Sequence, residues 1–186
     1  RRMVFPIYNE HSQIIGFSGR KVDDNDYAKW KHLGKKNNWI YPAYVPNKET
    51  VDSIIDEKCE VYLVESIGDA MSLHQQGIKN VLVIFGLSVS SSIITYLSSK
   101  KIDRVILAEN YLKLSNYFDL DALCIKNPPK GFNDLGDAHF QEVDLASWSK
   151  EIPDSKEQRK FISDFVADNE MKFSKTHIRK ASKLNE

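Results

Sequence analysis

Long apolar stretches are missing from this sequence of 186 residues. No stretch approaches the roughly 20 consecutive apolar residues of a membrane-spanning helix, so we expect no membrane association. Cysteine is scarce as well: Cys59 and Cys124 have no metal-ligand spacing, and each stands beside or within an expected buried strand. This usage predicts packed free thiols in a reducing compartment, and therefore a cytoplasmic protein.

A net charge is also absent. The chain has 26 Lys and Arg residues and 26 Asp and Glu residues, which gives a formal net charge of zero. This balance argues against a protein that binds nucleic acid through its overall charge. Basic residues nevertheless gather locally, between Lys29 and Lys36 and again after Met171. The sequence starts within an expected strand and without an initiator Met, so we expect a fragment of a longer protein.

The pattern of apolar residues predicts a β-hairpin followed by an α/β domain. The hairpin takes in residues 3–8 and 14–17, and a polar, irregular segment at 21–48 precedes a short helix at 48–57. Continuous apolar runs then alternate with helical patterns, which predicts a parallel, doubly wound sheet. The expected strands are 61–64, 81–85, 104–108 and 122–125, and the expected helices are 69–76, 90–100 and 111–117. The chain from residue 146 is charged and has helical spacing.

Acidic residues follow two of the expected strands. Glu65 and Asp69 come after the first strand, and Asp134 comes after the fourth. In an open parallel sheet, ligands bind beyond the carboxyl ends of the strands, so we expect these carboxylates at one site. Mg²⁺ is often held by one or two carboxylates together with substrate phosphates, which predicts a metal site. The alternative is that Asp69 only caps a helix and Glu65 only pairs with a nearby Lys or Arg.

A second candidate surface alternates basic residues with large rings. Lys29, Trp30 and Lys31 begin it, and Trp39 and Tyr41 end it. Single-stranded nucleic acid is held by such a combination, because cations contact phosphates while rings stack on bases. The alternative is that the tryptophans are core residues and the lysines a solvated face.

Several motifs resemble those of DnaG-type primases. Residues 61–77, VYLVESIGDAMSLHQQG, resemble the first motif of the Toprim domain, which is an apolar strand, Glu, three residues, Asp and a helix. Residues 2–20 resemble the hairpin that precedes Toprim in these primases. Residues 27–34 resemble the basic segment after the hairpin, and 130–134, KGFND, the last acidic motif, both in a phage-like form. The resemblance spans residues 1 to about 140.

The resemblance implies an α/β fold: a Toprim-type parallel sheet flanked by helices, with a small N-terminal α/β lobe and a helical C-terminal tail. We place the domains at 1–57, 58–145 and 146–186. The implied activity is synthesis of short RNA primers on single-stranded DNA from NTPs by Mg²⁺-dependent nucleotidyl transfer, with Mn²⁺ as the alternative ion. A replicative helicase is the implied partner, and for a viral protein the compartment is the host cytoplasm.

The resemblance also assigns roles to individual residues. Glu65 would bind metal or position the attacking hydroxyl, and Asp69 and Asp134 would bind metal directly or through water. The residues that would neutralise phosphates are Arg20, Lys29 and Lys31. Two other functions stay open: a Toprim-type metal-dependent nuclease, and a non-catalytic nucleic-acid-binding Toprim module.

One feature of the family is missing. Its third Toprim strand ends in an Asp-x-Asp pair that binds metal, whereas here Ala108 is followed by Glu109 and Asn110. Either Glu109 replaces the pair, or a loop carrying the pair is absent between Ala108 and Glu109. Intact-mass measurement separates these two explanations.

Overall fold

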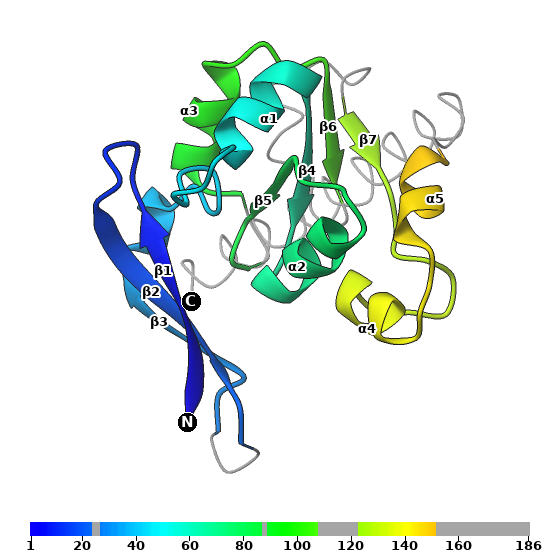
Figure 1. Ribbon diagram of the computed structural model, residues 1–186, viewed down its shortest axis with the longest axis horizontal. Helices are drawn as coiled ribbons and strands as arrows, with labels where there is room; N and C mark the ends of the chain where they lie inside the picture. The colour runs from blue at the N-terminus through cyan, green and yellow to red at the C-terminus, as the bar shows by residue number, and fades with distance from the viewer. Residues whose placement is uncertain (24–26, 87–88, 108–122, 152–186) are drawn as a thin grey trace, which may run out of the picture. The chain divides into compact units, whose positions relative to one another are not determined.

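Two β-sheets organise the part of the chain that the computed structural model describes, which is residues 1–23, 27–86, 89–107 and 123–151 (Figure 1). All of these residues belong to one structural unit, residues 1–151. The expected helix at 111–117, Glu109 and the chain beyond residue 151 lie outside the described residues. Within the described ranges, no helix is long and apolar enough to cross a membrane.

The N-terminal sheet is antiparallel, in the order β1-β2-β3. Its first two strands, β1 (Arg2–Tyr8) and β2 (Ile14–Lys21), form the predicted hairpin. Asn9 closes the turn, because its Oδ1 accepts hydrogen bonds from the backbone N–H groups of His11 and Gln13.

The third strand, β3 (Trp30–Gly34), corrects one prediction. It lies in the segment that the sequence predicts to be irregular. The strand is short, at an edge of the sheet and mostly exposed, so its side chains carry little of the apolar alternation that marks a buried strand. Backbone pairing with β2 is what orders it.

The second sheet is the predicted parallel one. Its strand order is β5-β4-β6-β7, with every neighbouring pair parallel. The order places the first strand, β4, in the interior, with later strands on both sides, as in a doubly wound sheet. The strands are β4 (Glu60–Val64), β5 (Val81–Val83), β6 (Arg104–Leu107) and β7 (Leu123–Ile125).

Helices cover both faces of this sheet (Figure 1). On one face α1 (Val51–Lys58) packs beside α3 (Ser91–Ser98), and the Tyr96 hydroxyl donates a hydrogen bond of 2.6 Å to Asp52. On the other face lie α2 (Ile67–Gln75), α4 (Leu135–Phe140) and α5 (Leu145–Lys150). The sequence did not predict α4, a helix of six residues that is too short for a helical period to show.

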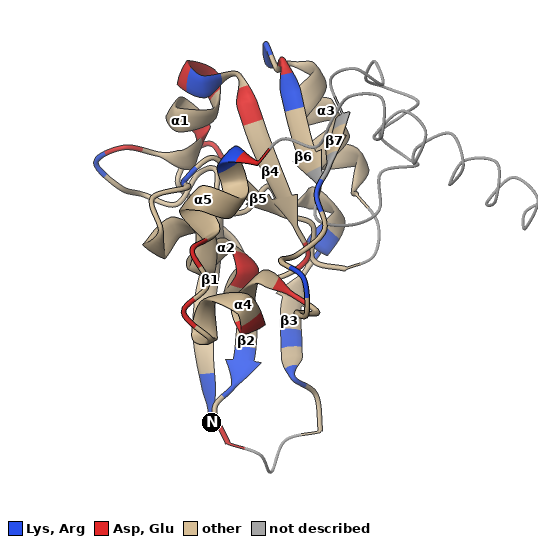
Figure 2. Ribbon diagram, turned by 90° about the vertical axis from the view of Figure 1, so that its right-hand side faces the viewer, with Lys and Arg blue, Asp and Glu red and all other residues tan. Residues whose placement is uncertain are grey.

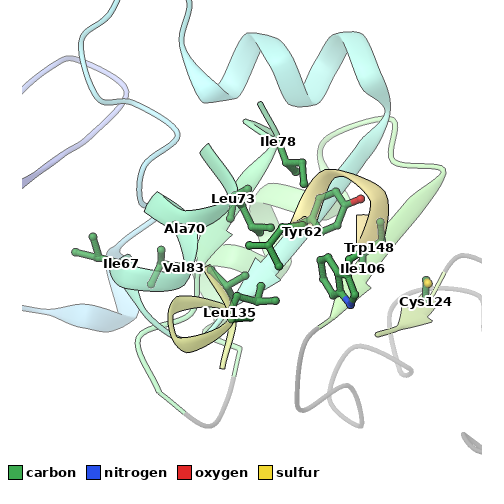
Figure 3. Packing of buried hydrophobic residues seen from close by; sticks show 14 residues of the cluster. Tyr62, Ile67, Ala70, Leu73, Ile78, Val83, Ile106, Cys124, Leu135 and Trp148 are labelled. Carbon is green, nitrogen blue, oxygen red and sulfur yellow. The ribbon is translucent and has the colours of Figure 1, made fainter. Parts of the chain in front are cut away.

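A hydrophobic core lies under α2, α4 and α5 (Figure 3). Tyr62 and Val64 of β4 point into it and meet Leu73 of α2, Leu135 of α4 and Trp148 of α5. Because side chains alternate along a strand, Val61 and Leu63 face α1 instead. Both faces of β4 are therefore buried, which explains its continuous apolar sequence.

Local sequence sets where the helices start. A serine, threonine or aspartate precedes each one, and its side chain accepts a hydrogen bond from the first turn. These residues are Thr50, Ser66, Ser90, Asp134 and Asp144. Helix α2 is followed by Gly77 at φ 84°, as the sequence predicts.

Aromatic packing joins the two sheets. Trp39, which is 1% exposed, contacts Phe85 at the end of β5 with ring centroids 5.0 Å apart. Val83 of β5 donates a backbone hydrogen bond of 2.8 Å to Tyr41. Trp39 also packs on Gly16 of β2, where a Cβ atom would lie only 2.5 Å from the Trp39 ring. Gly16 thus lets the N-terminal sheet approach the tryptophan.

We predict that Gly16→Ala lowers the free energy of unfolding by about 1–3 kcal/mol, because the added methyl group would clash with the Trp39 ring between the two sheets. Its Cβ would also lie 2.7 Å from the backbone oxygen of Leu33. Urea unfolding measures the effect. Gly19→Ala on the same strand is the control, since its nearest neighbour is the flexible Arg2 side chain at 3.3 Å. Equal losses of unfolding free energy in both variants would contradict a special role for the packing of Gly16 on Trp39.

Candidate functional site

A cavity of about 270 Å³ lies between the N-terminal sheet and the carboxyl ends of the parallel strands. Figure 2 shows basic residues on β2 and β3 and acidic residues on α2 and near α4. The N-terminal sheet and the loop just before β3 line one wall, and β4, α2, α4 and the end of β5 line the other. The lining residues are Ser18, Lys29, Trp30, His32, Glu65, Ser66, Ile67, Asp69, Phe85, Gly86 and Asp134.

All three predicted acids reach this cavity. Glu65 is exposed and directly follows β4, the strand at which the chain order switches sides. Asp69 is the third residue of α2 and is only 6% exposed. Asp134 caps α4, and its Oδ1 accepts a hydrogen bond of 2.6 Å from the backbone of Asp137.

Both oxygens of the Asp69 carboxylate accept hydrogen bonds. Its Oδ2 accepts hydrogen bonds from the Ser66 backbone at 3.2 Å and the Ser66 hydroxyl at 2.7 Å, which completes a capping box at the start of α2. Its Oδ1 accepts a hydrogen bond of 3.1 Å from the backbone of Gly136, in the first turn of α4. Asp69 therefore caps α2 and also ties α2 to the helix that Asp134 starts.

The carboxylates of Asp69 and Asp134 both lie next to Gly136. A Cβ atom at Gly136 would lie 3.2 Å from Asp134 Oδ1 and 3.8 Å from Asp69 Oδ1. Both oxygens therefore border the same small space beside the helix start. The first and last acidic motifs meet there, through a hydrogen bond between residues 69 and 136, which are 67 positions apart along the chain.

The carboxylate oxygens around the cavity could supply some, but not all, of the ligands of a hard cation. Carboxylates around a water-accessible cavity are the donors that Mg²⁺ accepts when substrate phosphates and waters complete its shell. Among the residues that the structure describes, however, no three His, Cys, Asp or Glu side chains form a ready-made metal cluster. The arrangement fits an ion held by one or two carboxylates better than one enclosed by protein.

The basic residues divide between the two faces of the N-terminal sheet. Lys29 lines the cavity beside Trp30. Arg20 stacks over the Trp30 ring at 5.5 Å, and its Nη1 lies 4.0 Å from where a Cβ of Gly68 would be, at the start of α2. Lys31 alternates with Trp30 and His32 along β3 and is not among the lining residues. Its predicted contact with phosphate stays a prediction.

Two residues of the cavity wall had no role predicted from the sequence. His32 lies within the predicted basic and aromatic stretch and Ser18 within the predicted hairpin, and both line the cavity. Period-two alternation from Trp30 would have pointed to His32, had β3 been recognised as a strand. Burial lowers the pKa of His32, and the nearby Lys36 lowers it further, so its ring is neutral at neutral pH.

Phe85 and Gly86 close one end of the cavity. Phe85 has a φ of 54°, which is strained for a residue with a side chain, and Gly86 follows at φ 146°. Lys36 Nζ donates a hydrogen bond of 3.2 Å to the Phe85 backbone oxygen, and the ring packs against Trp39 and His32. These contacts hold the strained turn at the wall of the site.

Two family models match the chain, each over one side of this cavity. Residues 1–41 match the N-terminal domain of the DNA primase catalytic core, and residues 62–110 match the Toprim-like family. Both are domains of primase catalytic cores or Toprim proteins, so the predicted resemblance to DnaG-type primases is confirmed, whereas the phage-like form stays a prediction.

Curated relatives and solved structures agree with this assignment. A DNA primase of Lactococcus lactis is 34% identical over 48% of this chain and 14% of its own length. A DNA primase of Clostridium acetobutylicum is 28% identical over 87% of this chain and 24% of its own length. The chain therefore spans a quarter or less of these relatives.

The fold matches solved primase structures. The RNA polymerase domain of Mycobacterium tuberculosis primase DnaG, in complex with a double-stranded DNA oligomer with an overhang, aligns with a TM-score of 0.67 and 18% identity. The match covers 85% of this chain and 55% of that one. A DnaG primase catalytic domain bound to single-stranded DNA aligns with a TM-score of 0.60 and 22% identity, over 80% of this chain and 51% of that one. The predicted fold class is confirmed, and the predicted domain boundaries stay predictions.

We predict that Asp69→Asn lowers the free energy of unfolding by about 1–3 kcal/mol, because an amide nitrogen cannot accept the hydrogen bonds of the oxygen it replaces. The variant therefore leaves a donor of Ser66 or Gly136 unpaired. Chemical denaturation measures the loss. Asp137→Asn, an exposed acid in the first turn of α4, is the control and should change stability by less than about 0.5 kcal/mol.

Proposed function

We propose that this chain is the catalytic part of a DNA primase. It would synthesise short RNA primers on single-stranded DNA from NTPs by divalent-metal-dependent nucleotidyl transfer. One observation carries the proposal: two acidic motifs and a wall with Lys29 and Trp30 line a single cavity. Each motif alone has a structural explanation, but an enzyme that joins nucleotides needs all of them together.

The acidic wall is suited to the reacting end of the primer. Bound Mg²⁺, or Mn²⁺ in its place, would activate the primer 3′-hydroxyl and stabilise the pyrophosphate leaving group during in-line attack on the α-phosphate. Glu65, Asp69 and Asp134 would hold the ions directly or through water. Glu65 would also position the hydroxyl, since it is the most exposed of the three acids.

The opposite wall is suited to phosphates and bases. Arg20 lies over the Trp30 ring, and Lys29 lines the cavity beside Trp30. These cations would neutralise phosphates while the ring offers a stacking surface. Lys31, on the other face of the sheet, would contact the template farther along. A replicative helicase as partner and action in the cytoplasm belong to the same proposal.

Two alternatives have distinct tests. A Toprim nuclease would cut intact plasmid and would not use ribonucleotides, and the basic N-terminal sheet argues against it. A non-catalytic module would bind DNA without binding Mg²⁺, which calorimetry detects. Glu109, which either replaces the family's Asp-x-Asp pair or follows a missing loop, lies outside the described residues.

We predict that Glu65→Gln reduces Mg²⁺-dependent primer synthesis by at least about 100-fold and leaves the urea midpoint unchanged, since glutamine keeps the size and removes the charge. Incorporation of labelled ribonucleotides on a single-stranded template measures the loss. Glu57→Gln, an exposed acid in the last turn of α1 and outside the cavity lining, should leave synthesis unchanged. Full activity of Glu65→Gln would overturn the assignment.

We also predict that Lys29→Gln weakens binding of single-stranded DNA by removing one phosphate contact. The slope of log K against log salt concentration should then become shallower by about 0.7. Fluorescence anisotropy of a labelled oligonucleotide over a salt series measures both effects. Lys101→Gln, an exposed lysine just before β6 and away from the cavity, should change neither. An unchanged slope for Lys29→Gln would place the DNA elsewhere.

A further inference from the structure

The hydroxyl of Ser18 is buried in the cavity wall without a partner. Ser18 lies in the middle of β2, directly across from Phe5 on β1 and His32 on β3. The residue has no exposed surface, and its Oγ accepts and donates no hydrogen bond. An unpaired buried hydroxyl costs about 1–3 kcal/mol, so a protein that keeps one beside a cavity needs a reason to do so.

His32 stands next to Ser18 on the same wall. Cross-strand partners in an antiparallel sheet project to the same face, so the imidazole and the hydroxyl are neighbours. The His32 ring has edge contacts with Trp39 and Phe85, at centroid distances of 5.8 Å and 5.6 Å. Within the described part of the chain, no hydrogen bond engages its nitrogens. A neutral imidazole offers one donor and one acceptor.

The two residues differ in charge from the rest of the cavity. Glu65, Asp69 and Asp134 make one wall anionic, and Lys29 supplies positive charge on the other. Ser18 and His32 add donors and acceptors that carry no charge at neutral pH. Cations are the better partners for phosphates, whereas a neutral donor and acceptor pair matches neutral hydroxyl groups. In a nucleotide, those groups are the hydroxyls of the sugar.

We propose that Ser18 and His32 bind the sugar hydroxyls of the nucleotide, and that Ser18 thereby makes the site prefer ribonucleotides to deoxyribonucleotides. This inference rests on the proposed function, because it assumes that the cavity takes a nucleotide. A site built to hydrogen-bond a substrate hydroxyl rejects the analogue that lacks it, since its own polar groups are then left unpaired. The 2′-hydroxyl is the group by which proteins distinguish RNA from DNA.

The test compares ATP with 2′-deoxy-ATP by titration calorimetry, in the presence of Mg²⁺ and with the full chain. Wild-type protein should bind ATP more tightly than 2′-deoxy-ATP. Ser18→Ala should weaken ATP binding by about fivefold, as expected for one neutral hydrogen bond, and leave 2′-deoxy-ATP binding unchanged. Ser53→Ala, which removes an exposed hydroxyl on α1, should change neither affinity.

A melting curve separates this role from a structural one. Because the Ser18 hydroxyl has no hydrogen-bond partner among the described residues, Ser18→Ala should not lower the melting temperature. His32→Ala, on the exposed edge strand, gives an independent variant that should show the same selective loss of ATP binding.

Three results would overturn the inference. Equal weakening of both nucleotides by Ser18→Ala would place its hydroxyl on a phosphate or a base. Unchanged selectivity in both variants would remove Ser18 and His32 from the sugar site while leaving the proposed function intact. Wild-type protein that binds neither nucleotide would contradict the proposed function as well.

Discussion

The carboxylate of Asp69 is the contact on which the candidate site depends. Three donors from two helices hold it, and they come from residues that are far apart along the chain. A buried carboxylate is costly unless its oxygens are hydrogen-bonded, and here the helix starts supply those bonds. By accepting them, Asp69 fixes α4 beside α2 and so brings Asp134 to the cavity that Glu65 borders. The capping interpretation of Asp69 is therefore correct, and its role as a metal ligand stays a prediction.

A second constraint fixes the distance between the acidic and basic walls. The N-terminal sheet contacts the parallel sheet through Trp39, Phe85 and Tyr41, and through the backbone hydrogen bond between Val83 and Tyr41. These contacts lie beside the cavity, so the packing that joins the sheets also shapes the site. The strained Phe85 backbone is kept in place by the same contacts. Strain that the surrounding structure must hold is common at functional sites.

Sequence reasoning succeeded where burial imposes a pattern. The strands β4, β5, β6 and β7 were expected because strands covered on both faces are continuously apolar. It failed at β3, which is exposed, and at α4, which is too short to show a period. Both elements are ordered by contacts with distant residues: β3 by pairing with β2, and α4 by the hydrogen bond from Gly136 to Asp69. Such contacts with distant residues cannot be predicted from the local amino-acid composition.

The resemblance to DnaG-type primases, the parallel sheet and the convergence of Glu65, Asp69 and Asp134 were predictable from the sequence alone. This was possible because the carboxyl ends of parallel strands share one edge of a sheet, so order along the chain predicts position in space. Three other features follow from the tertiary structure. Lys29 lines the cavity whereas Lys31 does not, the Asp69 carboxylate accepts hydrogen bonds at two helix starts, and among the described residues the buried Ser18 hydroxyl has no hydrogen-bond partner. Those outcomes depend on how two sheets pack and on which face of an edge strand turns inward. Neither is set by residues close together in the chain.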